Sequence, residues 1–247
     1  MYKFKQIMAM DLTNLFTNAM WIFYAIGFPL ALVLILGFLS SGSYGDTITS
    51  YDYYGVALMI FAVFNTSTFS ANSFLEERIK NANMRIIYSP VRPFYIPFSK
   101  VLASFVFCSV TYTLVTLILW LIAGVNYGGR LFWGPLIVMI LSIFFFSTLG
   151  ALVCCVVKSE SVANQILSLL LTLLAALGGV FFPIDGLGGV ISATSWISPA
   201  KWMLTACLRM IYDGDFSLFL PSCGILIILS IAAMWLMTVF FKEDEYI

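Results

Sequence analysis

Long uninterrupted runs of apolar residues dominate the pattern of hydrophobic and polar positions along this chain. A helix needs about 20 apolar residues to cross the hydrocarbon core of a bilayer, and six charge-free runs reach that length: Leu12–Gly45, Tyr53–Leu75, Val101–Gly129, Leu131–Val157, Ser161–Ile184 and Phe216–Phe241. The runs do not alternate as the strands of a transmembrane barrel would. The pattern therefore predicts an all-α integral membrane protein.

Composition agrees with this interpretation. The chain is 62% hydrophobic and only 10% charged, whereas soluble domains are about 25% charged, and its mean hydropathy is +1.01. We expect residues 1–247 to form a single membrane domain. Its six transmembrane helices should lie near Ala19–Leu39, Gly55–Leu75, Val101–Ala123, Phe132–Val156, Val162–Phe182 and Ser217–Phe240.

The distribution of cations predicts the orientation in the membrane, because Lys and Arg concentrate on the cytoplasmic side. With both termini cytoplasmic, nine of the 12 cations lie inside and three outside. The outer three are Arg130, Lys201 and Arg209. The reverse orientation would invert this ratio, so we expect a multi-pass protein with both termini cytoplasmic.

Two segments outside the spans also have helical patterns. Residues 1–17 read as an amphipathic helix on the inner leaflet, with Phe4, Ile7, Met8, Leu12 and Leu15 on one face; an ordinary juxtamembrane extension is the alternative. Residues 183–215 carry two cations and several Pro and Gly residues, which disfavour a seventh span. We expect a re-entrant pair of short helices on the outer side, packed into the mouth of the bundle.

The segment of residues 76–100 joins the second predicted span to the third and holds five of the 12 cations: Arg78, Lys80, Arg85, Arg92 and Lys100. Its middle, Arg78–Tyr88, can form a short helix that Pro90 and Pro93 end. Such a helix between two spans would transmit force to both of them. The alternative is a basic loop that only sets the topology.

Several kinds of chemistry are disfavoured by what the sequence lacks. It has no nucleotide-binding G-x-x-x-x-G-K-[ST] motif and no histidine, and no Asp or Glu lies inside a predicted span. The five cysteines have no metal-ligand spacing. We therefore expect no catalytic residues, no metal site and no cofactor in this chain; a Cys207–Cys223 bridge stays an open alternative to buried thiols.

The segment "ERIKNANMRIIYSP" resembles the first cytoplasmic loop of type 2 ATP-binding-cassette exporter permeases, which commonly reads E-R-E-x-G-T-x-E-x-L-x-x-[ST]-P. The residues that match it are Glu77, Arg78, Ile86 (on the leucine), Ser89 and Pro90, and those that depart from it are Ile79, Asn81, Ala82 and Met84. "FFPIDGL" and "WISPAKWMLTACLRMI" are similar to the family's outer hairpin, with Pro183, Pro199 and Arg209 at its marked positions.

This resemblance implies a permease subunit of an exporter, with no ATPase activity of its own. It implies two permease subunits, identical or different, on two cytoplasmic ATPase subunits that bind ATP and Mg. The Glu77–Pro90 helix would dock in the ATPase, with Arg85, Ile86 and Ile87 among its contacts. The expected location is the cytoplasmic membrane of a bacterium. A self-sufficient secondary carrier and a non-transporting scaffold remain alternatives.

Two polar stripes lie on the predicted spans. Asn65, Thr68 and Asn72 share one face of the second span, and Asn164, Ser168 and Thr172 share one face of the fifth. In the resembling family these two spans border the path between the subunits. Such side chains could line that path or could hydrogen-bond between helices. Because no stripe is charged, an amphipathic or apolar cargo fits better than a strongly ionic one.

Overall fold

All the regular secondary structure in the described part of the chain is helical, and this part contains no strand. The computed structural model describes residues 2–42, 44–45, 48–75, 95–184 and 188–241. Its helices are α1 (Tyr2–Thr17), α2 (Ala19–Ile22), η1 (Phe23–Gly27), α3 (Phe28–Leu39), α4 (Ser50–Leu75), α6 (Tyr95–Ala123), η2 (Gly129–Leu131), α7 (Trp133–Val157), α8 (Glu160–Leu177), α9 (Gly189–Ser195), α10 (Pro199–Leu208), η3 (Arg209–Asp213) and α11 (Phe219–Phe240).

Among the described residues, five helical stretches are long and apolar enough to cross a membrane: Ala19–Leu39, Ser50–Ser73, Tyr95–Ala123, Gly129–Val157 and Phe219–Phe240. They overlap the predicted first, second, third, fourth and sixth spans. The predicted fifth span corresponds to α8, whose apolar part, Ser161–Leu177, is shorter. At 1.5 Å per residue this part rises about 26 Å, against a hydrocarbon core of about 30 Å. The helix stops before the predicted boundary at Phe182 because Gly178 and Gly179 follow, the latter with a φ of +83°.

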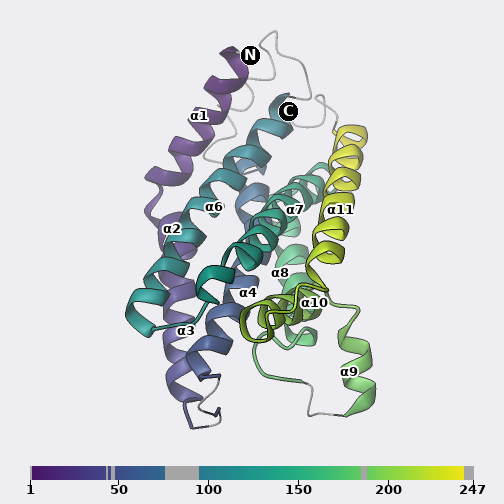
Figure 1. The fold of residues 1–247 in the computed structure, drawn as a ribbon. Coiled ribbons are helices and arrows are strands. Elements are labelled where there is room, and N and C mark those ends of the chain that lie inside the picture. The colour runs from purple at the N-terminus through teal and green to yellow at the C-terminus, as the bar shows by residue number, and fades with distance from the viewer. Residues whose placement is uncertain (1, 43, 46–47, 76–94, 185–187, 242–247) are drawn as a thin grey trace.

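Helix α4 is the centre of the bundle, and α3, α6, α7 and α8 pack around it (Figure 1). In its membrane window 83% of the residues are buried, against 22–44% for the other four candidate spans. Phe64 of α4 packs on Phe146 of α7 with ring centroids 4.4 Å apart. Near this contact, the α7 backbone at Gly150 lies directly against the α4 backbone at Ser67. The most extensive interhelical contact in the bundle is therefore the one between α4 and α7.

The first span contains a turn of π-helix. The backbone N–H of Phe28 donates to the carbonyl of Phe23, five residues earlier, within the sequence that joins α2 to α3. Pro29 follows directly and has no N–H to donate to the preceding turn. A π turn beside a proline is a recognised cause of local irregularity in a helix. The span thus crosses as α2, η1 and α3 in succession, where the apolar run predicts one regular helix.

The ends of the helices divide between two ends of the molecule. The start of α1, the start of α6 and the end of α11 lie at the top of Figure 1, whereas the turn between α3 and α4, the turn between α6 and η2, and helix α9 lie toward the bottom. Helices α9 and α10 are short and fall within residues 183–215, where a pair of short helices is predicted. The arrangement places this hairpin region opposite the start of the chain.

Candidate functional site

The two predicted polar stripes meet at one point of the structure. The side-chain amide of Asn164 on α8 donates to Oδ1 of Asn72 on α4, with 2.7 Å between nitrogen and oxygen. Asn72 is buried, and Oδ1 of Asn164 is buried without a partner among the described residues. This hydrogen bond joins α4 to α8, as the alternative of hydrogen bonding between helices expects for these two residues.

The α4 stripe faces a different neighbour at Asn65, two turns before Asn72. The hydroxyl of Tyr24 on η1 donates to Oδ1 of Asn65 at 3.4 Å, and Nδ2 of Asn65 donates to the carbonyl of Phe61 at 3.0 Å. Thr68, one turn further along α4, is half-buried. The structure therefore does not bring Asn65 and Asn164 together, although both belong to the predicted stripes.

The remaining stripe residues of α8 point away from the bundle. Ser168 and Thr172 are exposed, whereas the neighbouring face of the helix, Ala163, Leu167, Leu171 and Ala175, is buried. Gln165, which is exposed as well, donates to the Ser161 hydroxyl at 3.3 Å. Helix α8 thus presents a mixed polar and apolar surface to its surroundings, with apolar Ile166, Leu169 and Leu173 beside the polar groups.

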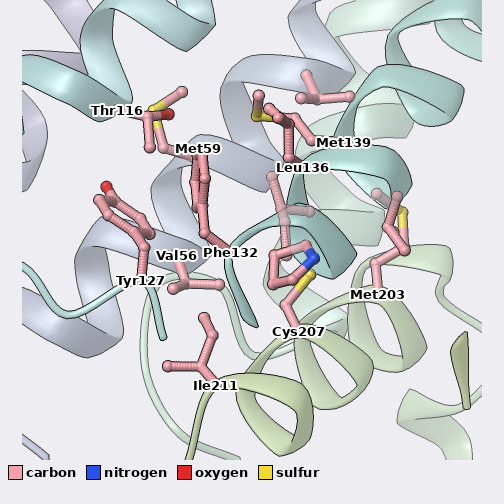
Figure 2. Close-up of a pocket in the computed structure, with 14 residues that line it drawn as sticks. Val56, Met59, Thr116, Tyr127, Phe132, Leu136, Met139, Met203, Cys207 and Ile211 are labelled. Atoms are coloured by element: carbon pink, nitrogen blue, oxygen red, sulfur yellow. The ribbon is translucent and has the colours of Figure 1, made fainter. Parts of the chain in front are cut away.

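A small cavity lies inside the bundle, between α4, α6, α7 and the helices α10 and η3 (Figure 2). Its volume is about 40 Å³, and its walls are almost entirely apolar, with Met59, Phe132, Met139 and Met203 among the residues that line it. Ligand sites commonly measure about 300–1,000 Å³. The cavity is therefore too small to hold a cargo molecule in this conformation.

At the end of α4 near this cavity, Asp52 joins three segments of the chain. Its Oδ2 accepts hydrogen bonds from the backbone N–H and the hydroxyl of Thr49, at 3.0 and 2.8 Å, and its Oδ1 accepts from the backbone N–H of Asn126 at 2.7 Å. Asp52 is 6% exposed. Since α4 begins at Ser50, five residues before the predicted span, this buried carboxylate falls in the first turn of the helix, where the helix dipole favours negative charge.

The predicted outer hairpin packs on the ends of α4 and α8. The hydroxyls of Tyr53 and Tyr54 donate to the carbonyls of Gly179 and Phe181. The Ser198 hydroxyl donates to the carbonyl of Leu174 and accepts from the backbone N–H of Ala200 at the start of α10. These bonds tie the segment after α8, and the first turn of α10, to the bundle.

The three hairpin residues singled out in the sequence have different surroundings. Pro183 is exposed, and Pro199 is the first residue of α10, where its missing N–H is harmless. Arg209 lies 3.8 Å from Asp215 in an exposed ion pair. Hydrogen bonds from Ser217 hold the pKa of Asp215 below its ordinary value, with a smaller contribution from Arg209.

A buried ion pair links α1 to α6, and nothing in the local sequence pattern indicated it. Nζ of Lys100 lies 3.1 Å from Oδ1 of Asp11, and the two side chains are 1% and 2% exposed. Ile7 and Leu15, one turn before and after Asp11, are buried, and Phe4 packs on the rings of Tyr95 and Phe98. Burial raises the pKa of Asp11, and the Lys100 ammonium lowers it by less.

The predicted ATPase-coupling residues Glu77, Arg78, Arg85, Ile86, Ile87, Ser89 and Pro90 lie outside the described residues. Within the part of the chain that is described, no group of three His, Cys, Asp or Glu side chains could hold a metal ion. Cys207 and Cys223 are free thiols, so the structure does not contain the bridge between them that the sequence left open.

These features define a multi-pass helical membrane protein whose polar groups pair between helices. The family model described as ABC-2 type transporter matches residues 2–212, from α1 to η3. The chain therefore belongs to the ABC-2 type transporter family, whose members are membrane transport subunits that associate with an ATP-binding-cassette ATPase. No curated protein gives a significant match.

Proposed function

We propose that this chain is the membrane-spanning permease subunit of an ATP-binding-cassette exporter. It forms the translocation path together with a second permease subunit, identical or different, and a separate cytoplasmic ATPase hydrolyses MgATP. Family membership over residues 2–212 supports this assignment. In the proposal the membrane is the cytoplasmic membrane of a bacterium, and the six crossings, α8 included, leave both termini inside.

The exposed polar face of α8 is the observation that carries the proposed path. Gln165, Ser168 and Thr172 are exposed on a helix between two membrane spans, and polar side chains in a membrane normally face protein or water. The interior cavity of about 40 Å³ cannot pass a cargo. A path between two subunits, bordered by this face of α8, would place these polar side chains next to water or protein and would not need the interior cavity. Because the face carries no charge, such a path suits an uncharged amphipathic or apolar cargo.

Coupling to the ATPase is proposed to run through Glu77–Pro90, the segment between α4 and α6. Those two helices pack on each other and on α7, so a force applied between their ends reaches the centre of the bundle. Ile86 and Ile87 are the expected apolar anchors, because buried anchors at interfaces commonly contribute about 2 kcal/mol or more. Loss of one anchor would weaken ATPase binding by roughly 30-fold.

The test is co-purification of the ATPase with permease variants, together with ATP-driven transport in proteoliposomes. Ile86→Asp should insert and fold normally but lose ATPase retention and transport, because a carboxylate buried in the interface has no partner. Arg85→Lys, which keeps the charge, is the matched control and should retain both. Normal retention and transport in Ile86→Asp would reject the coupling role. Transport with no ATPase present would favour a secondary carrier, and no transport with any ATPase would favour a scaffold.

A further inference from the structure

A second, larger hollow lies on the outside of the bundle, where α6 turns into η2 and α7. Its volume is about 400 Å³, ten times that of the interior cavity. The residues that line it include Thr113, Leu117 and Trp120 of α6, and Asn126, Tyr127 and Phe132 of the connection to α7. The volume falls in the range of small-molecule sites, and we call this hollow the α6–α7 groove.

The α6–α7 groove lies on an exposed and largely apolar surface of the bundle. Both helices that flank it are candidate spans, and the side chains around it on α6 are apolar and exposed: Leu114, Leu121 and Ile122. Leu117 and Trp120 within the groove are themselves about half exposed. An apolar hollow on such a surface is in contact with lipid chains, so its occupant is drawn from the bilayer.

Hydrogen-bond donors lie at, or next in sequence to, one end of the groove. Asn126 is exposed, and although its Oδ1 accepts from the N–H of Gly128, its Nδ2 donates to no group in the described part of the chain. Gly129 also lines the groove, and the exposed Arg130 follows it directly in η2. An amide N–H and a guanidinium are donors that bind phosphate oxygens well. Apolar walls, with a cation next in sequence to the lining residue Gly129, match a phospholipid.

The inner wall of the groove is fixed by the bundle. Thr116, Tyr127 and Phe132 line both the groove and the interior cavity, and Figure 2 shows the ring of Phe132 between Tyr127 and Leu136. The Tyr127 hydroxyl donates to the carbonyl of Gly55 on α4 at 3.4 Å. An occupant of the groove therefore rests on side chains that α4 also contacts, and a pre-formed wall lowers the cost of binding.

We propose that the α6–α7 groove is a phospholipid site, with one acyl chain against Leu117 and Trp120 and the phosphate held by Arg130 and Asn126. The site requires only that α6 and α7 span the membrane, so it stands apart from the proposed export function. Tryptophan is common at the level of lipid headgroups, which agrees with the position of the exposed Trp120 near the end of α6.

The experiment is native mass spectrometry of the full-length protein, released from nanodiscs that contain phosphatidylglycerol, to count the retained lipids. Leu117→Trp fills the groove and should remove one tightly held lipid per chain. Leu114→Trp is the matched control, because Leu114 is exposed on the same helix but does not line the groove; it should retain that lipid. Equal retention in wild type and Leu117→Trp, or equal loss in both variants, would overturn the site.

The second arm tests the phosphate. Arg130→Gln should weaken retention of phosphatidylglycerol roughly tenfold, since it removes a charge-assisted hydrogen bond. Diacylglycerol, which has the chains without the phosphate, should be held at that weaker level by wild type and variant alike. If Arg130→Gln retains phosphatidylglycerol as wild type does, or wild type holds diacylglycerol equally well, the occupant is not a phospholipid held by its phosphate, and the proposal is wrong.

Discussion

The close approach of α7 to α4 at Gly150 should make replacement of this glycine destabilising. A Cβ atom built on Gly150 would lie 2.0 Å from the carbonyl oxygen of Ser67, 2.7 Å from its carbonyl carbon and 2.8 Å from its Cα. All three are backbone atoms of a buried helix, so no side chain can rotate away. Ordinary contact begins at 3.4 Å, which requires a movement of 1.4 Å (3.4 minus 2.0) along that direction.

Two effects of Gly150→Ala oppose each other. Alanine favours the helical backbone over glycine by about 1 kcal/mol. Against this, separating α4 from α7 disturbs the contact between Phe64 and Phe146, and overpacking of a well-packed interior costs typically about 1–3 kcal/mol, occasionally more. Since the displaced atoms are backbone, we expect the upper part of that range and a net loss of about 2 kcal/mol. For a chain of this size that lowers Tm by about 4–8 °C.

The measurement is thermal unfolding in detergent with a thiol-reactive fluorescent dye. Cys108, Cys154, Cys155 and Cys207 are buried and would react only as the bundle opens. Gly224→Ala on α11 is the matched control, because a Cβ at that helical glycine meets no atom within 4 Å. It should keep or slightly raise Tm. Equal Tm values for the two variants would refute the argument from backbone contact.

Three further predictions concern two buried polar pairs, with Tm as the measure of stability. Lys100→Met should destabilise the protein by about 3–5 kcal/mol, because it leaves the Asp11 carboxylate buried without its partner. The double variant Asp11→Leu with Lys100→Met should recover most of that loss. A double variant that is no more stable than Lys100→Met would contradict this account. Because burial raises the pKa of Asp11 above 3.8, the contribution of this carboxyl to stability should be complete below about pH 4 and fall as pH rises through the folded pKa, and Asp11→Asn should flatten that slope. Asn164→Leu should cost about 1–3 kcal/mol by leaving Asn72 Oδ1 unpaired, with transport per folded molecule unchanged; reduced transport at normal Tm would instead favour a place on the path.

The extents of the helices could be predicted from the sequence because they depend on local properties. The first span, Ala19–Leu39, has the predicted bounds, and α7 and α11 differ from theirs by one or two residues. Helices α4 and α6 begin five and six residues before their predicted spans, because Asp52 and Lys100, charges at which a span was expected to end, are buried within them. The end of α8 was missed because Gly178 and Gly179 lie within an apolar run that looks continuous by composition. The π turn beside Pro29 was missed for a similar reason, although a proline inside a span was a usable signal.

The contacts between helices were beyond the sequence because they depend on rotation about each helix axis. Asn65 and Asn72 share a face of α4, yet one bonds to Tyr24 and the other to Asn164. Asp11 and Lys100 are 89 residues apart and each looks like an ordinary charge at the edge of a span. Nothing in the sequence around Ser67 indicates that its backbone contacts Gly150. The helical pattern predicts which residues share a face of a helix, but the partner of that face depends on how the helices pack in the bundle.

The ion pair between Asp11 and Lys100 has a consequence for biogenesis. Its two halves are separated by 89 residues, which take about 4–18 s to synthesise at about 5–20 residues per second. Helix α1 leaves the ribosome before α6 does, with a carboxylate on the face that it will later bury. It must therefore stay hydrated while the first two spans enter the membrane, and it docks only when the start of α6 arrives. Attachment of α1 to the bundle therefore waits for α6, although α1 is made well before it.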